Sequence, residues 1–279
     1  MNIWQAILMG VIQGLTEFLP VSSSGHLVLG KIFFGINIET SALFEALLHV
    51  GTLGAVFVYF WKDIKMLVVE GLKIIRDVFL LIFKKKAWED YPERRMVLFI
   101  IISSIPTAIL GLLVEAFLED IFFGSVIAVG CALLVTGLIL FSLTRIPMGH
   151  KGLDKMKYRD SLFLGIAQGF ATLPGISRSG TTVAAGLFCG LDKELAFRYS
   201  FLVGIPAILG SALLKLLKIS AADAANLGYY TVGMVVSFVL GLLTVRWIGD
   251  LIRKDRLHYF GYYCGAVGIA SIIAGLFIH

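Results

Sequence analysis

A single glutamate inside an apolar segment is the first residue in this sequence that could do chemistry. Glu17 follows Gln13 by four residues, so both side chains lie on one face of a helix. A charge at membrane depth costs roughly 3 kcal/mol on insertion scales, so it needs a function or a partner. Glu17 could act as a general base, or as a ligand for a divalent ion on a phosphate substrate. The alternatives are that it snorkels to the interface or is protonated.

A serine-rich loop, PVSSSGH at positions 20–26, follows directly. Ser22, Ser23 and Ser24 precede a helix, and hydroxyls with free N–H groups at a helix start suit an anion. The alternative is that these serines merely cap the helix. His26, beside the serine cluster, is a candidate proton carrier.

A second loop, PGISRSGTT at positions 174–182, carries the strongest single signal. Arg178 cannot easily reach water from such a loop, so it needs an anionic partner. A guanidinium fork suits two phosphoryl oxygens. An ion pair with Glu17 is the alternative, and both readings can hold in the ligand-free protein. The neighbouring candidates for substrate binding are Gly175, Ser177, Ser179, Gly180 and Thr182.

Composition places these loops in a membrane protein. Of 279 residues, 58% are hydrophobic and only 15% are charged, and the mean hydropathy is +0.90, whereas soluble domains are near 25% charged. The formal net charge is +5, and the basic residues gather in loops between apolar stretches. This placement is typical of residues that set the orientation of membrane spans, rather than of a nucleic-acid-binding surface. Cys131, Cys189 and Cys264 lie far apart in apolar segments, so no disulfide framework or CxxC metal site is expected. The N-terminus lacks a basic region, so we expect no cleaved signal peptide.

Six apolar stretches are long enough to span a bilayer, which needs roughly 20 residues. They are residues 41–61, 96–115, 121–143, 196–217, 229–248 and 259–278. Residues 1–36 and 161–190 are also apolar, but each is broken by one of the two loops. The arm at 183–190 would extend only about 12 Å as a helix, so we predict re-entrant hairpins; proline-kinked spanning helices are the alternative. Polar loops at membrane depth are tolerated where they line a wet cavity.

The charge pattern predicts the orientation of these spans. Lys and Arg crowd the segments 62–95 and 145–159, which should therefore be cytoplasmic. The segments 119–120 and 219–228 contain no Lys or Arg, as outside loops should. Both termini then lie outside.

The chain also repeats itself. Two segments are similar, GVIQGLTEFLPVSSSGH from Gly10 and GIAQGFATLPGISRSGT from Gly165, if one residue is dropped and one is added. Further along, Gly51 matches Gly204 at a spacing of 153. We therefore predict an all-α, polytopic fold in one membrane domain, 1–279, with repeat one at 1–145 and repeat two at 155–279. Each repeat is one hairpin plus three spans, so the two halves should be inverted, with a binding site near the midplane. Such an architecture also suits a transporter or lipid flippase.

Two long motifs give the chain a specific resemblance. QGLTE from Gln13 to Glu17 fits an (E/Q)xxxE motif and continues as FLPVSSSGH, and the loop at 174–182 fits PGxSRSxxT. In these motifs the chain resembles the undecaprenyl-diphosphate phosphatases associated with bacitracin resistance. Many members have Glu where this chain has Gln13, and this departure argues against an absolute requirement for two carboxylates.

The resemblance implies hydrolysis of undecaprenyl diphosphate to undecaprenyl phosphate and inorganic phosphate, which recycles the lipid carrier of cell-wall synthesis. The active-site positions that it implies are Glu17, Ser23, His26, Ser177, Arg178, Ser179 and Thr182. We expect Ser23, or a water that it positions, to attack the terminal phosphorus, with Glu17 or His26 taking the proton. A divalent cation, Mg²⁺ or Ca²⁺, would be held jointly by Glu17 and substrate phosphate.

Further expectations concern partners and location. The partners are a polyprenyl diphosphate substrate and membrane lipid, with no nucleic acid, and a homodimer is compatible with the sequence. The protein would lie in the bacterial inner membrane with its site facing outside. The rival function is a secondary transporter or polyprenyl-phosphate flippase.

Overall fold

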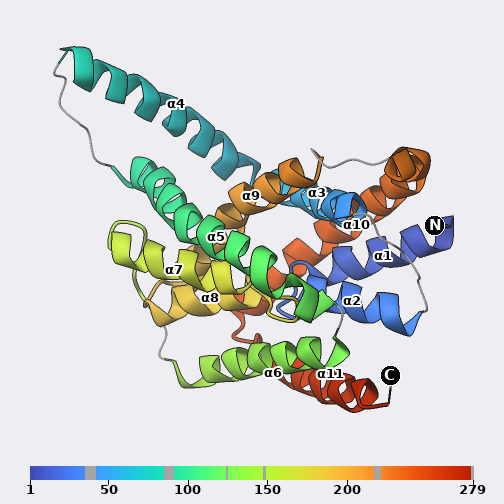
Figure 1. The fold of residues 1–279 in the computed structure, drawn as a ribbon. Coiled ribbons are helices and arrows are strands. Elements are labelled where there is room, and N and C mark those ends of the chain that lie inside the picture. Colours follow the sequence, from blue (N-terminus) through green and yellow to red (C-terminus); the bar gives the residue numbers. More distant parts are fainter. Residues whose placement is uncertain (35–41, 85–90, 124, 147–148, 217–220, 278–279) are drawn as a thin grey trace.

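A computed structural model of the chain is helical throughout the ranges that it describes (Figure 1). These ranges are residues 1–34, 42–84, 91–123, 125–146, 149–216 and 221–277. Within them no strand forms, and one isolated bridge joins Lys151 to Leu191. The predicted basic residues Lys85 and Lys86 and the start of the predicted outer segment, 219–220, lie outside these ranges.

Each predicted span coincides with a helix. Among the described residues, five helices are long and apolar enough to cross a membrane, and a sixth apolar helix has 17 residues. In chain order they are α3 (Ala42–Tyr59), α5 (Pro92–Phe123), α6 (Val126–Ser142), α9 (Lys193–Leu216), α10 (Ala221–Arg253) and α11 (Tyr259–Gly275). The expectation of an all-α, polytopic membrane protein is therefore confirmed.

The predicted element ends were wrong in two places. The outside segment expected at 119–120 is the end of α5, and most of the segment expected at 219–228 is the start of α10. Small and acidic residues there lower the hydropathy without breaking a helix, since Ala and Glu are good helix formers. Hydropathy thus marked the apolar part of each helix but not its full length.

A further helix, α4 (Trp61–Lys84), occupies the segment predicted only as a basic loop. Its exposed apolar residues Val68, Leu72, Ile75 and Phe79 recur at helical spacing. The side chain of Asp77 accepts a hydrogen bond from buried Arg94 of α5 at 2.6 Å. The guanidiniums of Arg94 and then Arg76 hold the pKa of Asp77 below its usual value. The contact between Asp77 and Arg94 holds the second half of α4 against the start of α5.

Two pairs of short helices occupy the segments in which the hairpins were predicted. They are α1 (Ile3–Thr16) with α2 (Ser23–Phe33), and α7 (Tyr158–Phe170) with α8 (Arg178–Phe188). The longest, α1, has 14 residues and is about 21 Å long, short of the roughly 30 Å of a hydrocarbon core. In Figure 1 the α1–α2 pair lies on the right and the α7–α8 pair on the left, and their loops meet near the centre.

Each hairpin packs on a helix of the other half through paired glycines. A Cβ on Gly14 of α1 would lie 2.7 Å from Leu240 Cβ of α10, and a Cβ on Gly169 of α7 would lie 2.6 Å from Leu110 Cβ of α5. Small residues four apart let membrane helices approach closely. In α7 the partner of Gly169 is Gly165, whose Cβ would lie 2.3 Å from the carbonyl oxygen of Ser103. The sequence repeat is thus matched by equivalent contacts.

We expect Gly165→Ala to destabilise the protein by about 1–3 kcal/mol, because the new methyl group meets backbone atoms of α5 that cannot rotate away. Gly265→Ala in α11 is the matched control, since its methyl group would meet nothing within 4 Å. Thermal unfolding in detergent should show a lower Tm for Gly165→Ala alone. Equal Tm values for the two variants would contradict this packing.

Candidate active site

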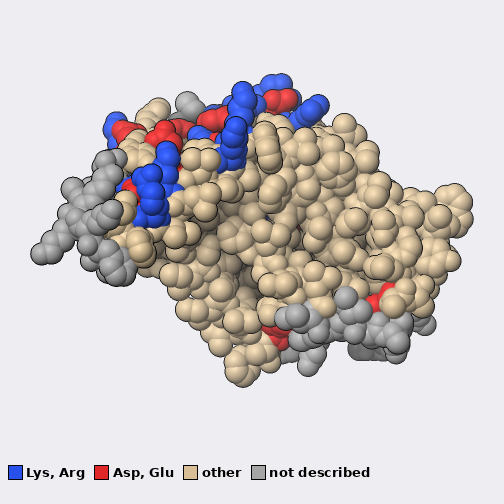
Figure 2. Space-filling view, turned by 90° about the horizontal axis from the view of Figure 1, so that it is seen from above, with Lys and Arg blue, Asp and Glu red and all other residues tan. Residues whose placement is uncertain are grey.

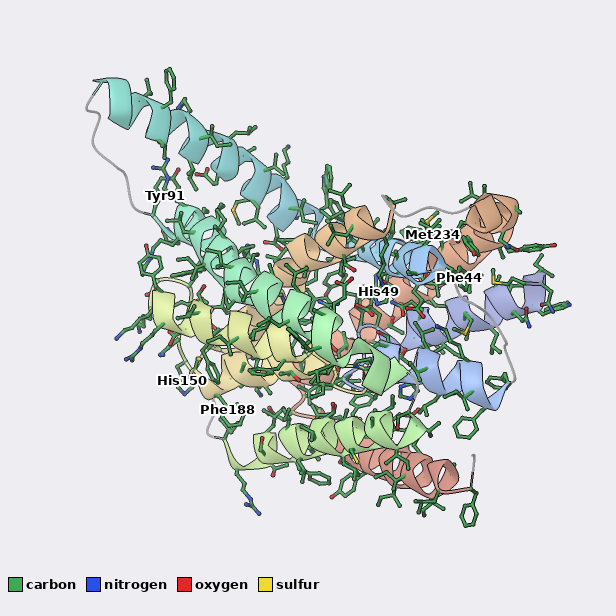
Figure 3. All side chains as sticks on the ribbon, viewed as in Figure 1. Phe44, His49, Tyr91, His150, Phe188 and Met234 are labelled. Atoms are coloured by element: carbon green, nitrogen blue, oxygen red, sulfur yellow. The ribbon has the colours of Figure 1, made fainter. Side chains whose placement is uncertain are left out.

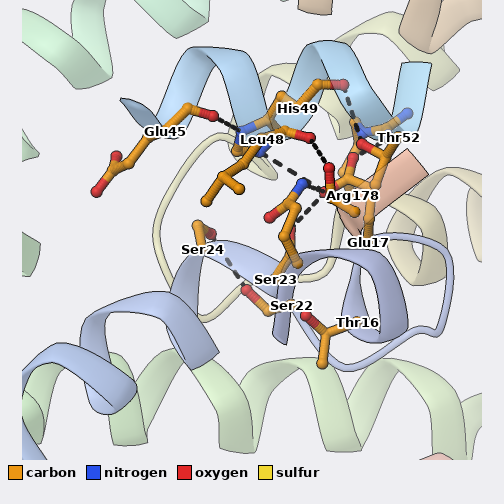
Figure 4. A network of polar contacts seen from close by, with 12 residues as sticks. Thr16, Glu17, Ser22, Ser23, Ser24, Glu45, Leu48, His49, Thr52 and Arg178 are labelled. Carbon is orange, nitrogen blue, oxygen red and sulfur yellow. Dashed lines mark hydrogen bonds and ion pairs between the residues drawn. The ribbon is translucent and has the colours of Figure 1, made fainter. Parts of the chain in front are cut away.

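Glu17 joins the two loops. It follows the last residue of α1, its side chain is buried, and its carboxylate accepts hydrogen bonds on both oxygens. Arg178 Nη2 donates to Oε1 at 2.5 Å, and Ser23 Oγ donates to Oε2 at 2.5 Å. Gln13 Nε2 also donates to Oε2, at 2.9 Å, and His49 Nε2 lies 3.6 Å from the same oxygen. Figure 4 shows this network.

Local chain geometry places the first serines. The turn between α1 and α2 contains Pro20, which cannot continue a helix. Ser22 adopts φ +68°, a left-handed conformation that is uncommon for a residue with a Cβ. Its Oγ accepts from Gly25 N at 3.3 Å and so caps α2. Ser23 is thereby the first residue of α2, with its hydroxyl turned to Glu17.

The second loop is held from behind by α6. Gly175 has φ +98°, and a Cβ there would lie 2.6 Å from Val129 O, so only glycine fits. Thr136 Oγ1 donates to Gly175 O at 2.8 Å and accepts from Ser177 N at 3.0 Å. Ser177 Oγ in turn accepts from Gly180 N at 3.2 Å and caps α8. Arg178 therefore begins α8 as Ser23 begins α2.

The two loops contact each other directly, as the sequence predicts. Gly175 N donates to Ser22 Oγ at 3.0 Å, and Ser179 Oγ donates to Leu19 O at 3.2 Å. A Cβ on Gly25 would lie 2.9 Å from Gly175 Cα. This close approach brings the starts of α2 and α8 together, so two helix N-termini with their partial positive charge face one region.

Arg178 lies against a glycine of α9. A Cβ on Gly204 would be 2.0 Å from Arg178 Nη1, so the absence of a side chain there makes room for the guanidinium. Behind it, Thr182 Oγ1 donates to Arg178 O at 2.8 Å and contacts Ser200 Oγ. Thr182 therefore positions α8 on α9 rather than facing substrate.

A polar cavity of about 220 Å³ lies over this network. Its wall contains Glu17, Ser22, Ser23, Ser24, Ser177 and Arg178 from the hairpins, and Glu45 and His49 from α3. Glu45 pairs with Lys31 of α2. Among the histidines labelled in Figure 3, His49 lies inside the molecule, whereas His150 lies at its edge.

Not all predicted site residues reach this cavity. His26 is turned away: its Nδ1 lies 2.8 Å from Ser22 O and its Nε2 lies 2.8 Å from Tyr263 Oη of α11. Gln13 is buried beneath Glu17, whose orientation it helps to fix. The remaining predicted residues support the loops without lining the cavity: Gly175, Ser179, Gly180 and Thr182.

Sequence reasoning missed several residues at the site. His49 and Glu45 were visible as polar residues inside a predicted span, a signal that could have found them. Gly204 was marked by the repeat but not assigned a role. Thr136 carried no signal, because a threonine in an apolar helix is common.

A second, apolar cavity opens beside the first between α5 and α9. Its volume is about 370 Å³, and it shares Thr172, Ala207, Ser211 and Lys215 with the polar cavity. Residues on its walls include Ala108, Gly111, Leu112, Pro206 and Leu214. A charged head group and an apolar tail would find adjoining compartments here.

These features define a polytopic membrane protein with a cavity lined by Glu17, Arg178 and several serines where the α1–α2 and α7–α8 helix pairs meet. The sequence profile described as "Bacitracin resistance protein BacA" matches residues 6–270. The chain belongs to that family.

Curated relatives match nearly from end to end. The chain is 42% identical over 278 residues to a protein of Desulforapulum autotrophicum, and 41% identical over 276 residues to one of Methanobrevibacter smithii, with 99% of both chains covered in each case. It is 43% identical over 272 residues to a protein of Korarchaeum cryptofilum, with 98% of this chain and 99% of the relative covered. All three are named undecaprenyl-diphosphatase.

Gly204→Ala tests whether the glycine makes room for Arg178. The new methyl group should displace the mobile end of Arg178 rather than backbone, so we expect activity to fall about a hundredfold while Tm changes little. Phosphate release and thermal unfolding, measured on the same preparation, check this. Gly210→Ala on the same helix is the control, because its methyl group would meet nothing within 4 Å. Full activity of Gly204→Ala would contradict the contact.

Proposed function

We propose that the chain hydrolyses undecaprenyl diphosphate to undecaprenyl phosphate and inorganic phosphate. The observation that carries this proposal is the hydrogen-bonded chain Ser23–Glu17–Arg178, in which a hydroxyl, a base and a guanidinium from two hairpins meet at one cavity. The names of the relatives support the substrate and the reaction. They do not favour the alternative of a pure transporter or flippase.

Binding would begin with an exchange of partners at Arg178. In the ligand-free protein its charge is balanced by Glu17 at 2.5 Å. A terminal phosphate entering the cavity offers two oxygens to the guanidinium fork, which it can bind in a bidentate manner. Free N–H groups at the starts of α2 and α8 add donors for the remaining phosphate charge. Once Arg178 turns to phosphate, Glu17 becomes a stronger base.

Ser23 is the best placed nucleophile. Its Oγ–H already donates to Glu17 Oε2 at 2.5 Å, so Glu17 can take this proton as Oγ bonds to the terminal phosphorus. The bond from that phosphorus to the bridging oxygen breaks, and the lipid monophosphate leaves with the bond electrons. Glu17 returns its proton to the departing lipid phosphate. A water then attacks the phosphoserine and passes a proton to Glu17, the bond from phosphorus to Ser23 Oγ breaks, and Glu17 gives this proton to Oγ as inorganic phosphate leaves. Both ring nitrogens of His26 have other partners, so Glu17 is preferred as the base.

The polyprenyl tail would lie in the apolar cavity between α5 and α9. That cavity adjoins the polar one at Thr172, Ala207 and Ser211. Its walls include the apolar side chains of Leu112 and Val114 from α5 and Leu214 from α9, and Leu112 and Leu214 are exposed. A long tail could therefore pass from the site into surrounding lipid without leaving apolar surroundings.

A divalent ion would fit this site only together with substrate. No group of three or more His, Cys, Asp and Glu side chains that could hold a metal occurs within the described ranges. Glu17 lies between the two loops, whereas Glu45, the other carboxylate that the structure describes on the cavity wall, pairs with Lys31. The buried Gln13 Oε1 has no hydrogen-bond partner among the described residues. Mg²⁺ commonly takes one or two carboxylates plus phosphate oxygens. When bound, such an ion would neutralise phosphate charge; the residues themselves supply the nucleophile and base.

We further propose that repeat one (1–145) and repeat two (155–279) insert in opposite orientations within one domain, as the notable matching of their glycine contacts suggests. The site would face outward from the bacterial inner membrane. Lys and Arg side chains in Figure 2 gather along one edge, and the coloured atoms of the opposite edge include acidic but no basic groups, which supports this orientation. The homodimer stays a prediction.

The reaction is tested by orthophosphate release from undecaprenyl diphosphate by the purified protein in detergent. We expect Ser23→Ala to lower turnover about a thousandfold, as removal of an activated nucleophile does, and Ser24→Ala to lower it far less. Glu17→Gln should resemble Ser23→Ala. Acid quenching with substrate labelled at the terminal phosphorus should trap phosphoserine in the wild type but not in Ser23→Ala. Nearly full activity of Ser23→Ala would refute its role as nucleophile.

Orientation is tested by labelling single cysteines in intact cells with a membrane-impermeant reagent, in a variant without native cysteines. Cysteine at position 22 should react from outside, because the first hairpin would enter from that side. Cysteine at position 155 should react only after the cells are opened. Reaction of both positions in intact cells would refute the inverted arrangement.

A further inference from the structure

Lys215 lies where the polar and apolar cavities join, near the outer end of α9. It lines both cavities and is half-buried. Ala207 and Ser211 precede it at intervals of four and line both cavities too, so one face of α9 leads from the site to the groove. Lys215 is the cation at the end of this face.

The charge of Lys215 has no partner within the described ranges. Arg178 pairs with Glu17, and Lys31 pairs with Glu45, so the other charges of the polar cavity are balanced there. Lys215 makes neither a hydrogen bond nor an ion pair with any residue of those ranges. An ammonium group on a partly apolar wall favours the approach of an anion.

The position of Lys215 matches one particular part of the substrate. Arg178 packs on Gly204, and Lys215 is eleven residues further along α9, about 16 Å at 1.5 Å per residue. Side chains on a helix tilt toward its N-terminus, which brings the Lys215 ammonium back toward Arg178. When the terminal phosphate lies at Ser23 and the tail lies in the groove, the second phosphoryl group points toward this lysine.

We infer that Lys215 binds the lipid-proximal phosphoryl group of the diphosphate, the group that remains on the lipid after cleavage. This inference rests on the proposed function and extends it. Arg178 would hold the phosphate that is released, and Lys215 the phosphate that stays. Lys215 thereby directs the tail into the groove between α5 and α9, and also holds the lipid monophosphate product.

The test compares Lys215→Gln and Lys215→Arg with wild type, using undecaprenyl diphosphate in detergent. Loss of one charge-assisted contact should raise KM about tenfold in Lys215→Gln, with kcat changed by less than about threefold; Lys215→Arg should retain most of the affinity. Inhibition by undecaprenyl phosphate should weaken by about the same tenfold factor. Inhibition by inorganic phosphate, which would bind at Arg178, should not change.

Two controls separate this role from a structural one. Lys193→Gln removes a lysine from the cytoplasmic end of α9, where it pairs with Asp255, and should leave all constants unchanged. Glu115→Gln removes the exposed carboxylate that lines the groove from α5. If it reproduced the rise in KM, pairing of Lys215 with Glu115 would explain the effect and the inference would fall.

Other outcomes are equally decisive. A Lys215→Gln protein with wild-type KM and wild-type product inhibition would overturn the inference while leaving the proposed function intact. Equal weakening of inhibition by undecaprenyl phosphate and by inorganic phosphate would also overturn it, since the lysine would then act on both phosphates. Absence of phosphate release from the wild type would instead refute the proposed function. Tm values measured for each variant exclude misfolding as the cause.

Discussion

The ion pair between Glu17 and Arg178 is the constraint around which the rest of the structure is arranged. Each group alone would be a buried charge at membrane depth, which is costly. Together, at 2.5 Å, they balance, and the pair closes a gap of 161 residues in sequence. The pair is also suited to exchange, because a phosphate can replace the carboxylate as the partner of Arg178. Glu17 then remains beside Ser23 with its own charge uncompensated, which favours proton uptake.

Holding this pair requires unusual backbone on both sides. Ser22 at φ +68° and Gly175 at φ +98° turn the chain so that α2 and α8 begin next to each other. Strained residues of this kind persist when their surroundings over-determine them. Here Ser22 Oγ accepts from both Gly25 N and Gly175 N, and Thr136 holds Gly175 and Ser177 from α6. These hydrogen bonds hold Ser23, Glu17 and Arg178 in place at the meeting point of the two loops.

Much of this could be predicted from sequence, because a membrane leaves few options for polar residues. The helices at the six predicted positions, the two breaks at the polar loops and the meeting of Glu17 with Arg178 followed from apolar length, glycine, serine and proline content, and charge. Which side chains line the cavity could not be predicted in this way. Hydropathy cannot tell that His26 turns to Tyr263 while His49 turns to Glu17, since that depends on the rotation of α2 and α3 about their axes. The helix α4 was hidden because its charges lower its hydropathy.

The two halves differ in the contacts of two glycines that match in the repeat. Gly51 of α3 packs so closely on α10 that a Cβ would lie 2.3 Å from Met234 O. The position that matches it in the repeat is Gly204 of α9, which contacts Arg178 instead. The helices α9 and α5 leave a cavity of about 370 Å³ between them. The equivalent pair in the other arrangement, α3 and α10, is in direct contact. One repeat therefore closes its side of the site by glycine packing. The other uses its glycine to make room for the guanidinium of Arg178 and leaves a cavity between α5 and α9.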